Sequence, residues 1–326
     1  VAEVRPGNPR YPYKPVIPLS VLINPVVEPL TAETFANYEG CLSVPGLRDR
    51  FIEKAASVPA DIILLDLEDS VPPARKAEAR AKVREAIPRF DKRGRLLFAR
   101  PNDLATELLE LDLDAVVVPG LDGIHLPKTH NAQVLRRADA YLTLLERARG
   151  IAPGSVRIIA WIESAEGVTN VESICRASPR LIGASMGAED YATSLGVMRT
   201  REGVEIEYAR ARVANAALAV GLVPIDCPEP DYQDLEHFES DIRHARTLGY
   251  RGKYCIHPTQ VEIANRVFSP SADQLVWAAR VREAYEAGEQ QGLGAVGLDG
   301  AMVDRPIYVR ALDMLRWQSA IQARVL

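Results

Sequence analysis

The feature that most constrains the fold is a regular alternation of short apolar runs with helix-length amphipathic segments. It begins near Leu42 and ends at His257. Apolar runs that are a helix apart are typical of parallel strands in an α/β protein. Eight strands with intervening helices over roughly 220 residues predict a TIM (β/α)8 barrel. An open doubly wound sheet is disfavoured because it would usually have fewer strands or a clear glycine-rich phosphate-binding turn. The eight runs are LSV, IILLDL, LLFAR, GIHL, RIIAWI, RLIGA, VPID and KYCI.

Two segments lie outside this alternation. Residues 1–41 are dense in proline, which permits extended or edge segments but no interior helix. Residues 269–326 contain a long helical pattern, a glycine-rich ribbon (LGAVGLDGAMVD) and a final helix. We therefore expect a proline-rich segment over 1–41, the barrel over 42–268, and a C-terminal helical extension over 269–326. That extension exceeds what a barrel requires, so we expect it to form a lid or an oligomer arm.

Composition narrows the class of protein. The hydrophobic and charged fractions, 47% and 25%, are those of an ordinary globular chain. A net charge of −5 gives no reason to expect nucleic acid or an anionic membrane as a partner. No apolar run approaches the ~18–20 residues that a membrane helix needs. The four cysteines are scattered, without a C-x-x-C pair, so a reduced cytoplasmic protein is expected.

Two of the apolar runs, RIIAWI and RLIGASM, are each followed by carboxylates. Glu163 follows the first run, and Glu189 and Asp190 follow the second. In α/β folds the carboxyl ends of the strands face the ligand crevice. Carboxylates from adjacent strands would supply the hard oxygen ligands that a divalent cation prefers. The alternative is that these acids only cap helices or lie in their first turns.

Charged or polar residues follow nearly every predicted strand. This composition suits a metal-dependent enzyme with an acidic substrate, because the acids can hold a cation while Arg100 grips a carboxylate or an enolate oxygen. Each residue alone could instead form a structural salt bridge or a cap. His257, before a proline, could be a general base or could fix a loop. The residues are Asp66, Glu68, Asp69, Arg100, Asn102, Lys128, Glu163, Glu189, Asp190, Asp226 and His257.

Several motifs resemble those of a known group of proteins. The chain is similar to the citrate lyase β-subunit-like proteins of the HpcH/HpaI aldolase superfamily, which include malyl-CoA, citramalyl-CoA and citryl-CoA lyases. The resemblance covers about Val44 to Ala311 and implies a TIM barrel. In family order, the matching segments are VPGLRDRFIEKA, DIILLDLEDSVPPARKAEAR, FARPND, GIHLPK, IIAWIESAEGV, GASMGAEDY, GYRGKYCIHPTQV and GAMVDRP.

The resemblance also implies roles for particular residues. Glu163 and Asp190 match the family's Mg²⁺ ligands (Mn²⁺ is a substitute), which leaves Glu189 as a neighbour. Arg100 matches the arginine that binds the substrate's carbonyl and carboxylate oxygens, and it counts with Glu68 as a catalytic group. Asp304 matches a catalytic aspartate that the C-terminal segment brings into a neighbouring subunit's site, which implies a homotrimer or hexamer. The implied substrate-binding residues are Arg100, Lys128, Asp69 and His257.

The implied reaction is reversible Claisen-type cleavage of a 3-hydroxy-3-carboxyacyl-CoA into an acyl-CoA and a 2-oxo acid. Malyl-CoA, citramalyl-CoA and citryl-CoA are such substrates. One alternative is a β subunit of a citrate lyase complex, acting on an acyl-carrier-protein thioester. Others are an aldolase of free 2-oxo acids and a catalytically silent barrel.

The N-terminal region carries a second resemblance. Residues 16–47 look like part of a peptide deformylase, including its E-G-C-L-S motif, in which Cys41 would be a metal ligand. That enzyme also needs a G-x-G-x-A-A-x-Q segment and an H-E-x-D-H helix, and both are absent from this chain. Without the two histidine ligands, a deformylase site cannot be assembled.

Overall fold

The computed structural model describes residues 2–4, 17–20, 40–46 and 49–325. The chain divides into two compact units, Val1–Phe35 and Ala36–Leu326. In the first unit, strands β1 (Ala2–Val4) and β2 (Ile17–Ser20) pair in antiparallel fashion. Most of the deformylase-like segment lies outside the described residues, as does the side chain of Cys41.

The second unit contains a closed barrel of eight parallel strands, as the alternation predicts. The strand order is β10-β3-β4-β5-β6-β7-β8-β9, so the first strand of the barrel lies between the second and the last. The barrel begins at Gly40, two residues before the predicted boundary. Its strands are β3 (Gly40–Pro45), β4 (Ile62–Asp66), β5 (Leu96–Arg100), β6 (Gly123–Leu126), β7 (Arg157–Ile162), β8 (Leu181–Met186), β9 (Val223–Asp226) and β10 (Gly252–Cys255).

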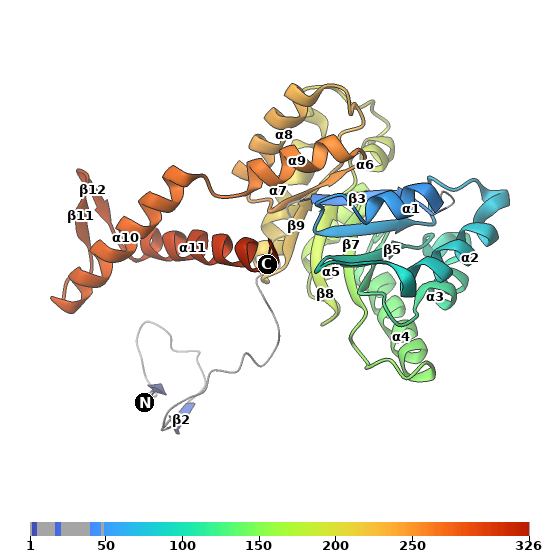
Figure 1. Ribbon diagram of the computed structural model, residues 1–326, viewed down its shortest axis with the longest axis horizontal. Coiled ribbons are helices and arrows are strands. Elements are labelled where there is room, and N and C mark those ends of the chain that lie inside the picture. The colour runs from blue at the N-terminus through green and yellow to red at the C-terminus, as the bar shows by residue number, and fades with distance from the viewer. Residues whose placement is uncertain (1, 5–16, 21–39, 47–48, 326) are drawn as a thin grey trace. The chain divides into compact units, whose positions relative to one another are not determined.

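Helices lie outside the strands (Figure 1). One of them, α6, is absent from the sequence-based expectation. It starts immediately after β8, so Glu189 and Asp190 lie in its first turn. The helices are α1 (Asp49–Ala55), α2 (Lys76–Ala86), α3 (Leu109–Val116), α4 (Ala132–Ala148), α5 (Ala165–Ile174), α6 (Ala188–Leu195), α7 (Val204–Leu218), α8 (Leu235–Thr247) and α9 (Pro258–Phe268).

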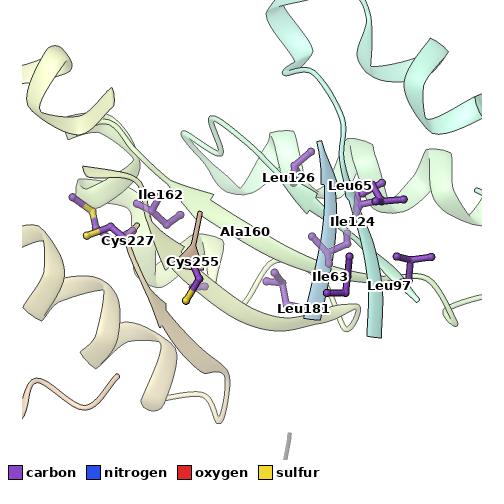
Figure 2. Packing of buried hydrophobic residues seen from close by; sticks show 14 of the residues in the cluster. Ile63, Leu65, Leu97, Ile124, Leu126, Ala160, Ile162, Leu181, Cys227 and Cys255 are labelled. Carbon is purple, nitrogen blue, oxygen red and sulfur yellow. The ribbon is translucent and has the colours of Figure 1, made fainter. Parts of the chain in front are cut away.

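Side chains alternate between the two faces of each barrel strand, because successive residues of a strand point to opposite sides. On β4, Ile62 and Leu64 belong to the cluster inside the barrel, whereas Ile63 and Leu65 belong to the larger core. Figure 2 shows Ile63 and Leu65 beside Leu97 of β5 in that larger core. The inner cluster consists of Ile62, Leu64, Phe98, Ile159, Trp161, Ile225 and Tyr254.

The C-terminal extension has a core of its own. Helices α10 (Ala272–Gln290) and α11 (Arg305–Val325) pack together, and the rings of Tyr285 and Tyr308 stack with centroids 4.5 Å apart. The glycine-rich ribbon forms a hairpin of β11 (Val296–Leu298) and β12 (Ala301–Val303). None of the helices in the described part of the chain is long and apolar enough to cross a membrane.

Candidate active site

The inward positions of β4 and β5 end in an ion pair at the mouth of the barrel. Asp66 follows Ile62 and Leu64 on the inner face, and Arg100 follows Phe98. The guanidinium binds the Asp66 carboxylate with two hydrogen bonds of 2.7 Å each. Burial opposes ionisation of Asp66, but Arg100 outweighs it and keeps the pKa of this carboxyl below its ordinary value. Asp66 therefore holds Arg100 in one orientation.

Glu68 lies on the other side of Arg100. Its Oε2 is 3.0 Å from Arg100 Nη1, and its Oε1 is 3.3 Å from Lys128 Nζ. Burial, reinforced by Asp69 and Asp66, raises the pKa of Glu68 to about 7, although Arg100 and Lys128 oppose the rise. A carboxyl group that titrates near neutral pH can both accept and donate a proton under physiological conditions.

Lys128 joins three acidic side chains. Its backbone has φ of +46°, in the left-handed region that non-glycine residues rarely adopt. In this conformation its N–H donates a 2.6 Å hydrogen bond to Glu163 Oε1. Its Nζ lies 3.3 Å from Glu68 and 3.4 Å from Asp103. The backbone of Lys128 thus orients Glu163 while its ammonium group balances the charge of the other two acids.

Glu163 is buried at the end of β7, and its second oxygen faces Gly187. A Cβ on Gly187 would lie 2.5 Å from Glu163 Cβ and 2.6 Å from Oε2, so only glycine leaves room for this carboxylate. Burial, Glu68 and Asp190 raise the pKa of Glu163 well above its ordinary value. A group of acids that opposes its own ionisation is a suitable place for a cation.

The described residues contain no group of three or more His, Cys, Asp or Glu side chains arranged to hold a metal ion. The predicted pair, Glu163 and Asp190, is a smaller set. It fits Mg²⁺, which usually binds one or two protein carboxylates and completes its shell with water and substrate oxygens. The donor set therefore fits the ion, and its role as a ligand pair stays a prediction.

A cavity of about 200 Å³ opens between these groups. It brings Arg100, Glu163, Asp190 and Asp69 together, as the strand-end pattern predicts, and Glu189 lies at the same cavity. A neighbouring cavity of about 290 Å³ shares Ser43 and Ile256 with it. The first cavity is lined by Ser43, Asp69, Arg100, Trp161, Glu163, Gly187, Ala188, Glu189, Asp190, Pro228, Tyr254 and Ile256.

Other predicted residues lie elsewhere. Asn102 hydrogen-bonds Asp112 and the backbone of Leu67, so it secures the loop after β5. Asp226 points away from the barrel interior and pairs with Arg210 of α7 and Lys253 of β10. Counting Asp226 among the residues at the barrel mouth was therefore wrong, because its inward neighbour is Ile225.

His257 and Asp304 are both found at helix N-termini. His257 caps α9, where its Nδ1 accepts a hydrogen bond from the N–H of Thr259, and its ring stacks on Tyr232. It lines the neighbouring 290 Å³ cavity, so its substrate-binding role stays a prediction. Asp304 precedes α11 and accepts a 3.4 Å hydrogen bond from the N–H of Ile307. It is not among the residues that line the 200 Å³ cavity, and its role in a neighbouring subunit stays a prediction.

Four residues of the site were not predicted from the sequence: Asp103, Trp161, Gly187 and Tyr254. Asp103 is the last residue of the FARPND motif, and Trp161 lies two positions before Glu163 on the same face of β7. The alternation of β7 could have identified Trp161. No sequence pattern marks Gly187, because glycine is required there only by the nearby position of the Glu163 side chain.

The fold and the site together define a class of protein: a (β/α)8 barrel with an acidic site at the carboxyl ends of its strands. Residues 41–258 match the model of the family described as HpcH/HpaI aldolase/citrate lyase. The chain belongs to the HpcH/HpaI aldolase/citrate lyase family, which confirms the resemblance and the predicted barrel.

Relatives of known activity and structure cover most of the chain. Citrate lyase subunit beta of Leuconostoc mesenteroides subsp. cremoris is 36% identical over 277 residues, covering 85% of this chain and 92% of the relative. L-malyl-CoA/beta-methylmalyl-CoA lyase of Cereibacter sphaeroides is 38% identical over 300 residues, covering 86% and 94%. The crystal structure of CitE from Mycobacterium tuberculosis in complex with magnesium, acetoacetate and coenzyme A is 30% identical. It covers 87% of this chain and 99% of CitE, with a TM-score of 0.71.

Proposed function

We propose that this protein is a Mg²⁺-dependent carbon–carbon lyase. It cleaves a 3-hydroxy-3-carboxyacyl-CoA into an acyl-CoA and a 2-oxo acid, and it also catalyses the reverse condensation. The observation that carries the proposal is the placement of Arg100, Glu163 and Asp190 around one cavity. The named activity of the malyl-CoA lyase and the ligands of CitE support it.

Glu163 and Asp190 would hold the Mg²⁺, which supplies a Lewis acid for the oxygens of the oxo-acid end. Arg100 binds the same end with its fixed guanidinium, already oriented by Asp66. Preorganised positive charge of this kind stabilises the oxyanion and enolate as they form. Because Arg100 needs no rearrangement, its contribution is greatest in the transition state.

Proton transfer completes the reaction. In the cleavage direction a base takes the proton of the 3-hydroxyl group, and the carbon–carbon bond breaks. The electron pair passes to the thioester enolate, which is then protonated to give the acyl-CoA. Glu68, with its pKa of about 7, is suited to move a proton at the oxo-acid end. We assign protonation of the enolate to Asp304 of a neighbouring subunit.

An oligomer with shared sites is part of this proposal. Exposed apolar side chains on α6, α7 and the segment between them continue from the rim of the site, where Glu189 and Asp190 lie. They are Leu195, Val197, Met198, Val204 and Tyr208, of which Met198 is 87% exposed. The C-terminal extension exposes Val276, Leu293, Met302 and Val309. Contact between two such surfaces would cover both and bring Asp304 to the site of a second copy.

The deciding experiment measures cleavage of malyl-CoA, citramalyl-CoA and citryl-CoA by the purified protein, with Mg²⁺ and with a chelator. We expect Mg²⁺-dependent release of a 2-oxo acid from at least one thioester. Activity on an acyl-carrier-protein thioester alone would instead support the citrate lyase subunit, to which the identity with citrate lyase subunit beta also points. Mg²⁺-dependent binding of a 2-oxo acid without cleavage of any thioester would contradict the lyase.

Shared sites can be tested by complementation. Arg100→Lys and Asp304→Asn variants should each be nearly inactive as homo-oligomers. Mixed after partial dissociation, they should regain activity, because some sites then combine an intact Arg100 with an intact Asp304. Absence of recovery, with mixed oligomers demonstrated by mass spectrometry, would contradict the role of Asp304 in a neighbouring site.

A further inference from the structure

Trp161 lies in the site without a role in the proposed chemistry. It projects from β7 into the barrel, two residues before Glu163, and lines the same cavity as Arg100 and Asp190. Only 6% of it is exposed. An aromatic side chain that is buried beside charged groups must gain either packing or a polar contact from its position.

The ring of Trp161 is held on both sides. Its indole stacks on Tyr254, with centroids 4.9 Å apart and planes 12° from parallel. The guanidinium of Arg100 lies 4.8 Å from the ring centroid. Tyr254 is fixed in turn by hydrogen bonding between its hydroxyl group and the ring nitrogens of His125, which is fully buried. The indole is therefore a rigid part of the cavity wall.

The indole N–H of Trp161 has no hydrogen-bond partner among the described residues, although its nitrogen is buried. Indole can only donate, and an unmade hydrogen bond of a buried donor is costly. Any side chain at Gly187 would collide with this nitrogen and with the predicted metal ligand, because a Cβ there would lie 2.6 Å from Trp161 Nε1 and 2.6 Å from Glu163 Oε2. A donor held beside the predicted metal ligand is placed for an oxygen that arrives with the substrate.

The charges around the cavity restrict which oxo acid fits. Among the described residues that line it, Arg100 is the only cation, and Asp66 and Glu68 already share its charge. Four acids line the same cavity: Asp69, Glu163, Glu189 and Asp190. One substrate carboxylate can bind between Arg100 and a metal ion. Apart from Arg100, the charged residues that line the cavity are all acids, so a second carboxylate would bind there at a cost in repulsion and desolvation.

We propose that Trp161 contacts the substrate and determines specificity: its N–H donates a hydrogen bond to an oxygen of a 2-oxo acid that carries a single carboxylate. This inference rests on the proposed lyase function. It predicts that pyruvate or glyoxylate binds more tightly than oxaloacetate, and therefore that malyl-CoA or citramalyl-CoA is preferred to citryl-CoA. The stacked indole sets the size of the space for the oxo-acid end.

The test is titration calorimetry of the Mg²⁺-loaded protein with pyruvate, glyoxylate and oxaloacetate. Trp161→Phe keeps an aromatic ring and removes the N–H, so it should weaken binding of the preferred oxo acid about 10-fold or more. Trp277→Phe, in α10 and outside the cavity, is the matched control and should bind like the wild type. Unchanged Mg²⁺ affinity and cooperative unfolding would show that Trp161→Phe retains the site and the fold.

A second measurement leaves Trp161 in place. In the Trp277→Phe/Trp317→Phe variant, Trp161 is the sole tryptophan, and its fluorescence should change when the oxo acid binds. Two results would overturn this inference but not the proposed function, provided that the wild type binds an oxo acid. One is equal binding by Trp161→Phe, and the other is no change in Trp161 fluorescence on binding. Tighter binding of oxaloacetate than of pyruvate and glyoxylate would overturn the single-carboxylate preference. If the wild type binds none of the three, the proposed function itself fails.

Discussion

Two clusters of acidic and basic side chains in the barrel differ in how well their charges are balanced. One, at the mouth of the barrel, contains Asp66, Glu68, Arg100, Lys128, Glu163 and Asp190. The other lies behind β9 and β10 and contains Asp226, Asp241, Arg210 and Lys253. In the second cluster two acids and two cations are joined by five hydrogen bonds of 2.6–3.0 Å. Burial opposes ionisation of Asp241, but Lys253 and Arg210 outweigh it and lower its pKa.

The mouth cluster is not balanced in this way. Burial and the neighbouring acids raise the pKa values of Glu68 and Glu163, and the two cations do not compensate for this effect. Breaking a balanced buried cluster destabilises the fold, whereas an unbalanced cluster beside a cavity is a candidate ligand site. This difference predicts that neutralising an acid of the mouth cluster impairs activity but not stability, and that neutralising an acid of the second cluster impairs stability but not Mg²⁺ binding.

The largest effect is expected from Glu163→Gln. It removes a predicted metal ligand, so kcat/KM should fall by more than about a thousandfold, since a bound cation contributes several kcal/mol to transition-state stabilisation. The metal-free variant should be at least as stable as the metal-free wild type, because a buried, unbalanced charge is lost. Calorimetric Mg²⁺ titration and urea unfolding measure the two quantities. A large loss of stability would mean that Glu163 belongs to the structural type of cluster.

Asp226→Asn should lower stability without affecting Mg²⁺ binding. It leaves Arg210 and Lys253 short of one negative charge in a buried place, so the free energy of unfolding should fall by about 3–5 kcal/mol. Mg²⁺ affinity of the folded protein should stay at the wild-type value. Weakened Mg²⁺ binding without loss of stability would remove the distinction between the two clusters.

Glu68→Gln sharpens the comparison through pH. Because the pKa of Glu68 is raised from 4.5 to about 7, the folded protein holds a proton in this window that the unfolded chain has released. The free energy of unfolding of the metal-free wild type should therefore decrease as pH rises from 4.5 to 7. Relative to the Gln variant, the decrease should be about 2–3 kcal/mol. Denaturant titrations at several pH values measure it, and parallel pH profiles of the two proteins would show that Glu68 does not carry this shift.

The smallest effect is expected from His257→Asn. Asparagine is also a favoured N-cap residue, so stability should change by less than about 1 kcal/mol. kcat/KM should stay within about twofold of the wild type if the histidine acts only as a cap, because no general acid–base contribution is then lost. Steady-state kinetics measure this, and a loss of about a hundredfold would place His257 in the chemistry instead.

The barrel could be predicted from the sequence because apolar runs alternate regularly with helical segments. It also placed Arg100 and Glu163 at one end of the barrel. It could have excluded Asp226, since Ile225 occupies the inward position of the same strand. Helix α6 was missed because it follows β8 without a connecting segment and is only 8 residues long. The roles of Gly187 and Asp103 depend on contacts between strands that no single segment encodes.

Closure of the barrel has a consequence for how the protein is made. Strand β3 pairs with β4, its neighbour in sequence, and with β10, which is more than 200 residues later. During synthesis β3 therefore presents an unpaired edge until nearly all of the barrel has left the ribosome. Such edges are templates for wrong pairing between chains, and contacts of this sequence separation form slowly. Yield of the folded protein should thus depend on the rate of translation and on chaperones that shield this edge.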